Sequence, residues 1–139
     1  KVYQYVGDEV VLSWNIKEGI ENGHCIKTFF AYDSLIQSKK KYYKAKYGII
    51  PEFKAGLHLG KVTVAEIGEI KKELAYHGDV LNTAARIQGK CNEFKTRLLV
   101  SEPMKAILEK LCLFNFSDIG YVSLRGKAEQ VNLYRVEPV

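Results

Sequence analysis

The sequence predicts one α+β domain over residues 1–139, in which helices flank a mostly antiparallel β-sheet. A length of 139 residues suits a single domain with one core. Apolar residues make up 47% and charged residues 27%, which is typical of globular proteins and argues against a disordered tail or a disulfide-stapled scaffold. Segments that alternate like strands and segments with helical spacing follow one another without a repeat or a linker.

The start of the chain predicts a β-hairpin. Two extended runs, 2–6 and 9–16, flank Gly7, which can take the positive φ that a tight turn requires. This turn places Asp8 at the tip of the hairpin. Residues 18–22 then form a polar break that contains a glycine.

A long amphipathic helix is predicted over residues 25–47, with Gly23 and Gly48 just outside it. Its apolar residues at helical spacing are Ile26, Phe29, Phe30, Leu35 and Ile36. The last nine residues, 39–47, hold five lysines and three tyrosines, and basic residues suit the negative end of a helix dipole. Such a cluster can meet the phosphates of a nucleic acid or an acidic membrane, but a solvated helix end is the simpler interpretation.

The middle of the chain predicts strands followed by a helix. Residues 53–64 alternate as a strand with a bend at Gly60, and a turn at Gly68 leads to a second strand arm. A helix is predicted over residues 79–92. Its apolar face holds Val80, Ala84 and Ile87.

The last third of the chain predicts strands around one more helix. A short strand, 98–100, precedes a helix that begins at Ser101, has Pro103 in its first turn and ends near Leu111. Residues 114–136 form strand-like alternating segments around Gly120 and Gly126.

Charge and cysteine content bear on the partners of the chain and on its cellular compartment. The chain has 21 Lys+Arg against 16 Asp+Glu, and its net charge of +5 favours anionic partners. Cys25, Cys91 and Cys112 lack C-x-x-C spacing, which indicates thiols in a reducing compartment rather than a zinc or redox site. No apolar run approaches the roughly 18 residues that cross a bilayer. We therefore expect a cytoplasmic domain that meets a membrane only through segments outside this chain.

The most specific feature is the stretch from His77 to Arg86, His-Gly-Asp-Val-Leu-Asn-Thr-Ala-Ala-Arg. Asn82 and Arg86 are four residues apart, so they project from one face of the predicted helix. An amide and a guanidinium that point the same way can hold a sugar oxygen and a phosphate together. Taken alone, the pair also fits an ordinary solvated helix face.

Five motifs, taken in order, resemble the catalytic domain of class III nucleotidyl cyclases, the adenylate and guanylate cyclase family. They are Tyr5-Val6-Gly7-Asp8-Glu9, the strand Phe53 to Gly60, Ile67-Gly68, Gly78-Asp79 with Asn82-Thr83-Ala84-Ala85-Arg86, and Leu124-Arg125-Gly126-Lys127. The resemblance covers essentially the whole chain. It implies a ferredoxin-like core and conversion of a purine nucleoside triphosphate to its 3′,5′-cyclic monophosphate and pyrophosphate.

The resemblance also implies a role for each matching position. Asp8 binds Mg²⁺ or Mn²⁺, which prefer oxygen ligands, and two such ions would assist the reaction. Asn82 orients the ribose, and Arg86 stabilises the charge that builds on the α-phosphate. Arg125 binds the terminal phosphates. In this family the site forms in a head-to-tail homodimer, with metal carboxylates from one subunit and the Asn/Arg pair from the other.

Two departures from the family pattern bear on activity. The first metal-binding aspartate of the family lies in an F-x-D-I-x-G-F segment upstream of the hairpin, and the sequence has no such segment. Since residues 1–6 already alternate like a strand interior, we expect the chain to be the later part of a longer domain and to be inactive, or nearly so, by itself. The two base-selecting positions hold Gln4, which can read either purine edge, and Ala75, which offers no side-chain partner. We expect ATP as the substrate, because this pair lacks the guanylate-specific Glu/Cys pattern.

Two other classes of function stay open. Ala75 and the missing aspartate favour an inactive cyclase-homology domain that serves dimerisation or regulation. The retained residues argue against it, namely Asp8, Asn82, Arg86 and Arg125. A basic nucleic-acid binder lacks the aromatic pair on a strand that such modules use, so we expect no nucleic-acid partner. His58 is interpreted as a packed or half-exposed strand residue.

Overall fold

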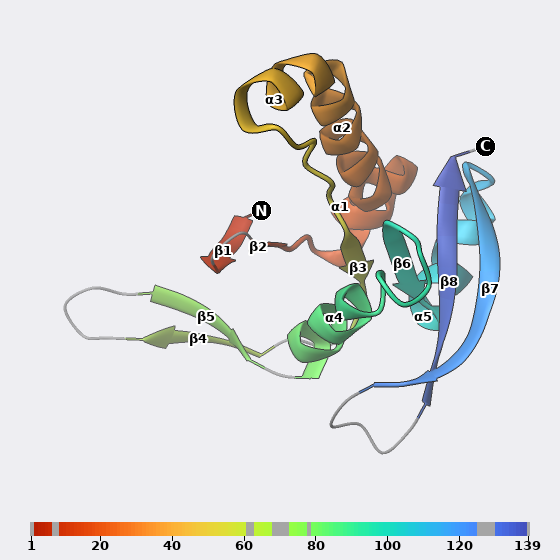
Figure 1. The fold of residues 1–139 in the computed structure, drawn as a ribbon. Helices are drawn as coiled ribbons and strands as arrows, with labels where there is room; N and C mark the ends of the chain where they lie inside the picture. Colours follow the sequence, from red (N-terminus) through yellow and green to blue (C-terminus); the bar gives the residue numbers. More distant parts are fainter. Residues whose placement is uncertain are drawn as a thin grey trace. The chain divides into compact units, whose positions relative to one another are not determined.

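A computed structural model describes residues 2–6, 9–60, 63–67, 73–77, 79–124 and 130–138. The chain forms two compact units, Lys1–Phe53 and Lys54–Val139, and each is described by itself (Figure 1). Both units contain helices and strands, as the α+β prediction requires. Within the described ranges no helix has the length and apolar character needed to span a membrane.

The first unit opens with the predicted hairpin. Strand β1 (Val2–Val6) pairs antiparallel with β2 (Glu9–Leu12), and the last residue of β1 lies opposite the first residue of β2. The two residues that join the strands, Gly7 and Asp8, lie outside the described residues. The flanking strands therefore confirm the hairpin itself, while its tip stays a prediction.

The prediction of a strand over 9–16 and a polar break after it is wrong beyond Leu12. The strand ends at Leu12, and helix α1 (Ile16–Ile20) begins four residues later. The 3₁₀ turn η1 (Glu21–Gly23) follows this helix. The side chain of Asn15 accepts a hydrogen bond from the Glu18 amide at 2.8 Å, so it satisfies a donor at the helix start that the strand pattern did not anticipate.

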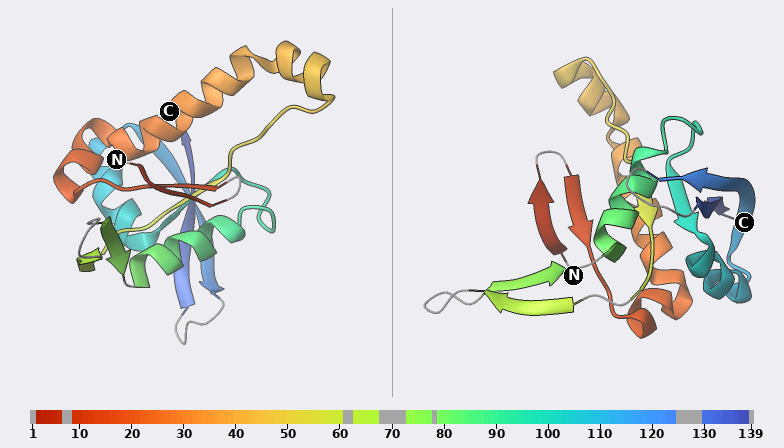
Figure 2. Two further views of the ribbon diagram at one scale, coloured as in Figure 1. Left: turned by 90° about the vertical axis from the view of Figure 1, so that its left-hand side faces the viewer. Right: turned by 90° about the horizontal axis from the view of Figure 1, so that it is seen from below.

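The single helix predicted over 25–47 is two helices, α2 (His24–Ser38) and α3 (Lys40–Tyr47), which follow one another in Figure 2. The Ser38 hydroxyl donates to the Leu35 carbonyl at 2.6 Å. That carbonyl is the acceptor that the Lys39 amide would use in a continuous helix, and the amide bonds to the next carbonyl instead, at 3.0 Å. Local competition by a serine side chain therefore accompanies the break.

The apolar face predicted for this segment is partly confirmed. Of its five predicted residues, Ile26, Phe29 and Ile36 are buried, and Cys25, which the prediction did not include, is buried as well. Leu35, however, is 54% exposed, because it lies about 100° around the helix from its buried neighbour Ile36. The predicted apolar face is thus narrower than its sequence pattern suggested.

The second unit is built on a four-stranded sheet with the order β3-β6-β8-β7. These strands are β3 (Ala55–Leu57), β6 (Leu98–Ser101), β8 (Gln130–Pro138) and β7 (Phe114–Ser123). The pair β3–β6 is parallel, whereas β6–β8 and β8–β7 are antiparallel, which confirms a mostly antiparallel sheet flanked by helices (Figure 1). A parallel pair needs a long crossover, and here it contains a hairpin and a helix.

The hairpin in this crossover is a separate two-stranded sheet. Strand β4 (Thr63–Ile67) pairs antiparallel with β5 (Glu73–His77), as Figure 2 shows. The continuous strand predicted over 53–64 is therefore wrong, because the chain leaves the main sheet after Leu57. The second strand arm is confirmed, and the turn predicted at Gly68 lies outside the described residues.

Helices α4 (Asp79–Gly89) and α5 (Glu102–Leu108) cover opposite faces of the sheet. Since side chains alternate along a strand, Leu99 and Tyr134 point to different sides. The side of Leu99 holds a buried cluster with α4, and Lys105 of α5 meets Tyr134 on the other side. The buried cluster comprises Ile87, Cys91, Leu99, Leu124 and Leu133.

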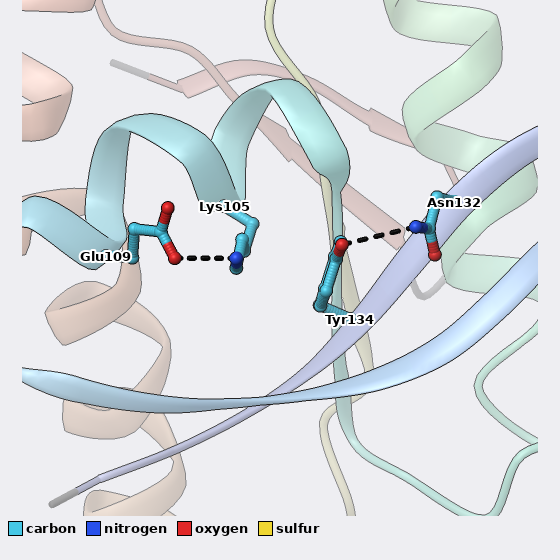
Figure 3. Close-up of polar contacts among 4 residues, drawn as sticks. All are labelled: Lys105, Glu109, Asn132 and Tyr134. Atoms are coloured by element: carbon cyan, nitrogen blue, oxygen red, sulfur yellow. Dashed lines mark hydrogen bonds and ion pairs between the residues drawn. The ribbon is translucent and has the colours of Figure 1, made fainter.

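Figure 3 shows two polar pairs on the second face, Lys105 with Glu109 and Asn132 with Tyr134. Lys105 Nζ lies 2.6 Å from Glu109 Oε2 and 5.0 Å from the centre of the Tyr134 ring. Asn132 donates a hydrogen bond to the Tyr134 hydroxyl at 3.2 Å. The hydrogen bond to Glu109 raises the pKa of Lys105, and desolvation raises the pKa of Tyr134. Lys105 is therefore a cation and Tyr134 a neutral phenol at neutral pH.

All three cysteines are free thiols, of which Cys25 and Cys91 are buried and Cys112 is exposed. Burial raises the pKa of both buried thiols, that of Cys91 to about 11. A thiol with so high a pKa stays protonated near neutral pH and is a poor nucleophile and metal ligand. The two buried cysteines therefore act as small apolar groups.

Candidate active site

Helix α4 carries the two residues that the sequence singled out most strongly. Thr83 and Ile87 are fully buried on its inner side. Asn82 is exposed and Arg86 is half-buried, and both lie away from that inner side. Since they are four positions apart, their Cα atoms are about 6 Å apart along the helix axis, so one ligand can span both. The shared face predicted from their spacing is confirmed.

Both polar side chains are available to a ligand. Within the part of the chain that the structure describes, neither Asn82 nor Arg86 forms a hydrogen bond or an ion pair. A half-buried guanidinium without a partner has lost part of its hydration without compensation. Such a group gains from an anion that accepts two parallel hydrogen bonds, as a phosphate does.

Strand β3 holds α4 through direct backbone contact. A Cβ added to Gly56 would lie 2.4 Å from the Gln88 amide nitrogen and 2.7 Å from the Ala84 carbonyl oxygen. One added to Gly60, just after the strand, would lie 2.6 Å from a methyl group of Val80. Helix and chain therefore approach as closely as glycine permits, and this contact fixes the position of the α4 residues.

The role of Gly56 and Gly60 in positioning α4 was not predicted from the sequence. The available signal was the spacing of Gly56 and Gly60, four residues apart in the segment Gly-Leu-His-Leu-Gly. The sequence pattern marks only Gly60, as a bend, because a close approach of two backbones is visible only when both partners are placed. The burial of Thr83 was not predicted from the sequence either. Its hydroxyl oxygen is buried without a hydrogen-bond partner among the described residues.

The interpretation of His58 as a packed or half-exposed strand residue is confirmed only in part, because His58 is half-buried but follows β3 and does not lie in it. Its Nδ1 lies 2.7 Å from the Ser101 hydroxyl, and Ser101 is fully buried. Ser101 occupies the N-cap position of α5, but its side chain makes no capping hydrogen bond there. The contact with His58 thus ties the end of β6 to the residue that follows β3.

The remaining predicted site residues are placed only in part. Gln4 lies in β1 and Ala75 in β5, where their backbones pair with Val11 and Ala65. Asp8 and Arg125 lie outside the described residues. The structure therefore brings together Asn82 and Arg86, the α4 pair, and the roles of all six predicted site residues stay predictions.

A metal ion would depend on the hairpin tip. Among the described residues, no group of three or more His, Cys, Asp or Glu side chains could hold a metal ion. Asp8, between β1 and β2, offers a carboxylate of the type that Mg²⁺ and Mn²⁺ prefer. Its donor chemistry fits such an ion, but one carboxylate needs further oxygen ligands, for which substrate phosphates are suited.

Residues 34–137 match the family described as the adenylate and guanylate cyclase catalytic domain. The chain belongs to this family, so the resemblance inferred from the five motifs is confirmed. Catalytic domains of this family use a nucleotide substrate, depend on metal ions and form dimers.

Two bacterial proteins illustrate the relationship. The chain is 29% identical over 127 residues to adenylate cyclase 2 of Rhizobium meliloti (strain 1021), covering 91% of this chain and 35% of that protein. It is 25% identical over 141 residues to adenylate cyclase 1 of the same strain, covering 97% of this chain and 20% of that protein. The chain thus spans about a third of the length of the first relative and a fifth of the second.

Solved structures show the same fold. The adenylyl cyclase CyaB from P. aeruginosa superposes with a TM-score of 0.75 at 16% identity, over 99% of this chain and 71% of that one. A bacterial light-regulated adenylyl cyclase superposes with a TM-score of 0.73 at 19% identity, over 98% of this chain and 38% of that one. At these identities the likeness establishes the fold alone, and it confirms the predicted cyclase type of α+β core.

Proposed function

We propose that this protein is an adenylate cyclase that converts ATP to 3′,5′-cyclic AMP and pyrophosphate in intracellular signalling, in the cytoplasm. The observation that carries the proposal is the α4 pair: Asn82 and Arg86 share one face, have no partner among the described residues and stand on a helix held by backbone contact. Membership of the cyclase family supports it, and both Rhizobium relatives are named adenylate cyclases. Both units would belong to one catalytic domain.

The two side chains divide the work on the substrate. The Asn82 amide holds the ribose so that its 3′-oxygen is in line with the α-phosphorus. The new bond joins that oxygen to the α-phosphorus while the hydroxyl proton passes to solvent water, the bond to the β-phosphate bridging oxygen breaks, and pyrophosphate leaves with the bonding electrons. The Arg86 guanidinium donates to the α-phosphate oxygens, where negative charge increases in the transition state.

The other predicted residues complete the site in this proposal. Asp8 would hold Mg²⁺ or Mn²⁺, which neutralises phosphate charge and makes the ribose hydroxyl easier to deprotonate. Arg125 would bind the terminal phosphates, and Gln4 and Ala75 would line the base. In a head-to-tail homodimer, Asp8 comes from one subunit and the α4 pair from the other, so an isolated subunit has no complete site.

The proposal is tested with the purified full-length protein, Mn²⁺ and either ATP or GTP. We expect cyclic AMP and pyrophosphate in equal amounts from ATP, and a slower reaction with GTP. A folded dimer that forms neither cyclic nucleotide would contradict the proposal and favour the regulatory, inactive alternative. A faster reaction with GTP would keep the cyclase chemistry and overturn the base assignment.

A further inference from the structure

An exposed surface on α3 combines positive charge with aromatic and apolar side chains. We call it the α3 surface; it comprises Lys39, Lys40, Lys41, Tyr42, Lys44, Lys46, Tyr47 and Ile49. Tyr42 is 53% exposed, Tyr47 59% and Ile49 67%. None of these residues takes part in the proposed reaction, so they call for a separate explanation.

The α3 surface carries the whole charge excess of the chain. Five of the 21 basic residues lie on it, and the other 16 are matched in number by the 16 acidic residues. No acidic residue occurs between Asp33 and Glu52. The positive potential is therefore concentrated on residues 39–46 and is not neutralised by neighbours in sequence.

The aromatic rings are held among the lysines. Lys46 Nζ lies 5.4 Å from the ring centres of both Tyr42 and Tyr47, and 3.0 Å from the Tyr42 hydroxyl. Tyr43 stacks on Tyr47 with ring centres 6.3 Å apart. These contacts hold the tyrosine rings in exposed positions, so that binding through them costs little further side-chain entropy. Each tyrosine also has an apolar ring and a polar hydroxyl tip.

We propose that the α3 surface docks onto a bilayer that is rich in anionic phospholipids. Lysines near such a surface each add to binding, and tyrosine rings favour the boundary between headgroups and acyl chains. Ile49 and the rings supply the apolar contact that a stable membrane association needs besides charge. A nucleic acid would use the lysines and rings but gives Ile49 no apolar partner, so a membrane fits the whole surface better. This replaces the interpretation of the segment as a solvated helix end.

The test is vesicle flotation with the 139-residue chain. The vesicles consist of phosphatidylcholine alone or of phosphatidylcholine with about a third phosphatidylglycerol, at low and at high salt. We expect binding to the anionic vesicles only, and a clear loss of binding as salt rises, because exposed charges are screened. Absence of binding to anionic vesicles at low salt would overturn the proposal.

Two matched variants separate the α3 surface from net charge. The test variant is Lys39→Gln, Lys40→Gln and Lys41→Gln; the control is Lys17→Gln, Lys27→Gln and Lys110→Gln, at exposed positions elsewhere. Both lower the net charge by three. At roughly fivefold per lysine, we expect the test variant to lose about a hundredfold in vesicle partitioning and the control to lose little.

Two further outcomes decide the proposal. An equal loss in both triple variants would show that net charge alone drives binding and would contradict it. Ile49→Ser should weaken vesicle binding at every salt concentration at which binding occurs. If the chain instead binds a single-stranded RNA but no vesicles, and Ile49→Ser leaves the RNA binding unchanged, the surface is assigned to nucleic acid.

Discussion

Replacing Arg86 with alanine should lower the cyclase rate of the full-length protein at least about a hundredfold, with little change in stability. The guanidinium is half-buried and has no partner among the described residues, so its removal leaves no buried charge unpaired. Because it contacts oxygens whose charge grows in the transition state, we expect kcat to fall while KM for ATP changes little. Initial rates of cyclic AMP formation over a range of ATP concentrations measure both constants.

Arg86→Lys is the matched variant. Lysine keeps the positive charge but cannot donate two parallel hydrogen bonds from a planar fork, so we expect a rate between those of Arg86→Ala and the native protein. Equal losses in both variants would mean that the fork geometry is essential. A rate for Arg86→Ala within about threefold of native would remove Arg86 from the mechanism altogether.

Gly56→Ala should destabilise the chain by about 1–3 kcal/mol, the usual cost of overpacking. The added Cβ would meet two backbone atoms of α4, at 2.4 and 2.7 Å, and backbone atoms cannot move aside as a flexible side chain can. The helix must shift away from β3, and Asn82 and Arg86 move with it. We therefore expect lower stability in urea denaturation and also a lower kcat in the full-length protein.

Gly89→Ala is the control on the same helix. A Cβ at Gly89 would have no atom within 4 Å, and alanine favours helices over glycine by about 0.5–1 kcal/mol. We expect its free energy of unfolding to be unchanged or slightly higher. Equal stability of Gly56→Ala and Gly89→Ala would contradict the close contact between β3 and α4.

Features that depend on local pattern were predictable from the sequence. The first hairpin followed from alternation on both sides of Gly7, and α4 followed from its apolar spacing and polar start. The same periodicity placed Asn82 and Arg86 on one face. In each of these cases, neighbours in sequence carry the information, because side-chain direction repeats every two or 3.6 residues.

Features that depend on competing partners were not predictable in this way. The break between α2 and α3 coincides with one hydroxyl that takes a backbone acceptor, and α1 begins where Asn15 satisfies an amide. The run 53–64 has a strand pattern throughout, yet only its middle pairs in the main sheet. Periodicity describes which side chains share a face, but it does not say which hydrogen-bond partner each backbone group finds.

The site shows the same division. Spacing alone identified the α4 pair. That Arg86 has no competing partner among the described residues could be recognised only from the surroundings of the helix. The close contact between Gly56 and α4 could be recognised only with both elements in place, because a glycine in a strand has several explanations until its neighbour is known.

The most direct test of the central claim, a cyclase site shared between two subunits, is complementation between Asp8→Ala and Arg86→Ala. Each variant alone should be inactive, because both of its sites lack one essential group. In an equimolar mixture of full-length proteins with free subunit exchange, about half of the dimers are mixed, and each mixed dimer has one intact site out of two. The account predicts recovery to about a quarter of native activity. No recovery in a mixture shown to contain mixed dimers would contradict it.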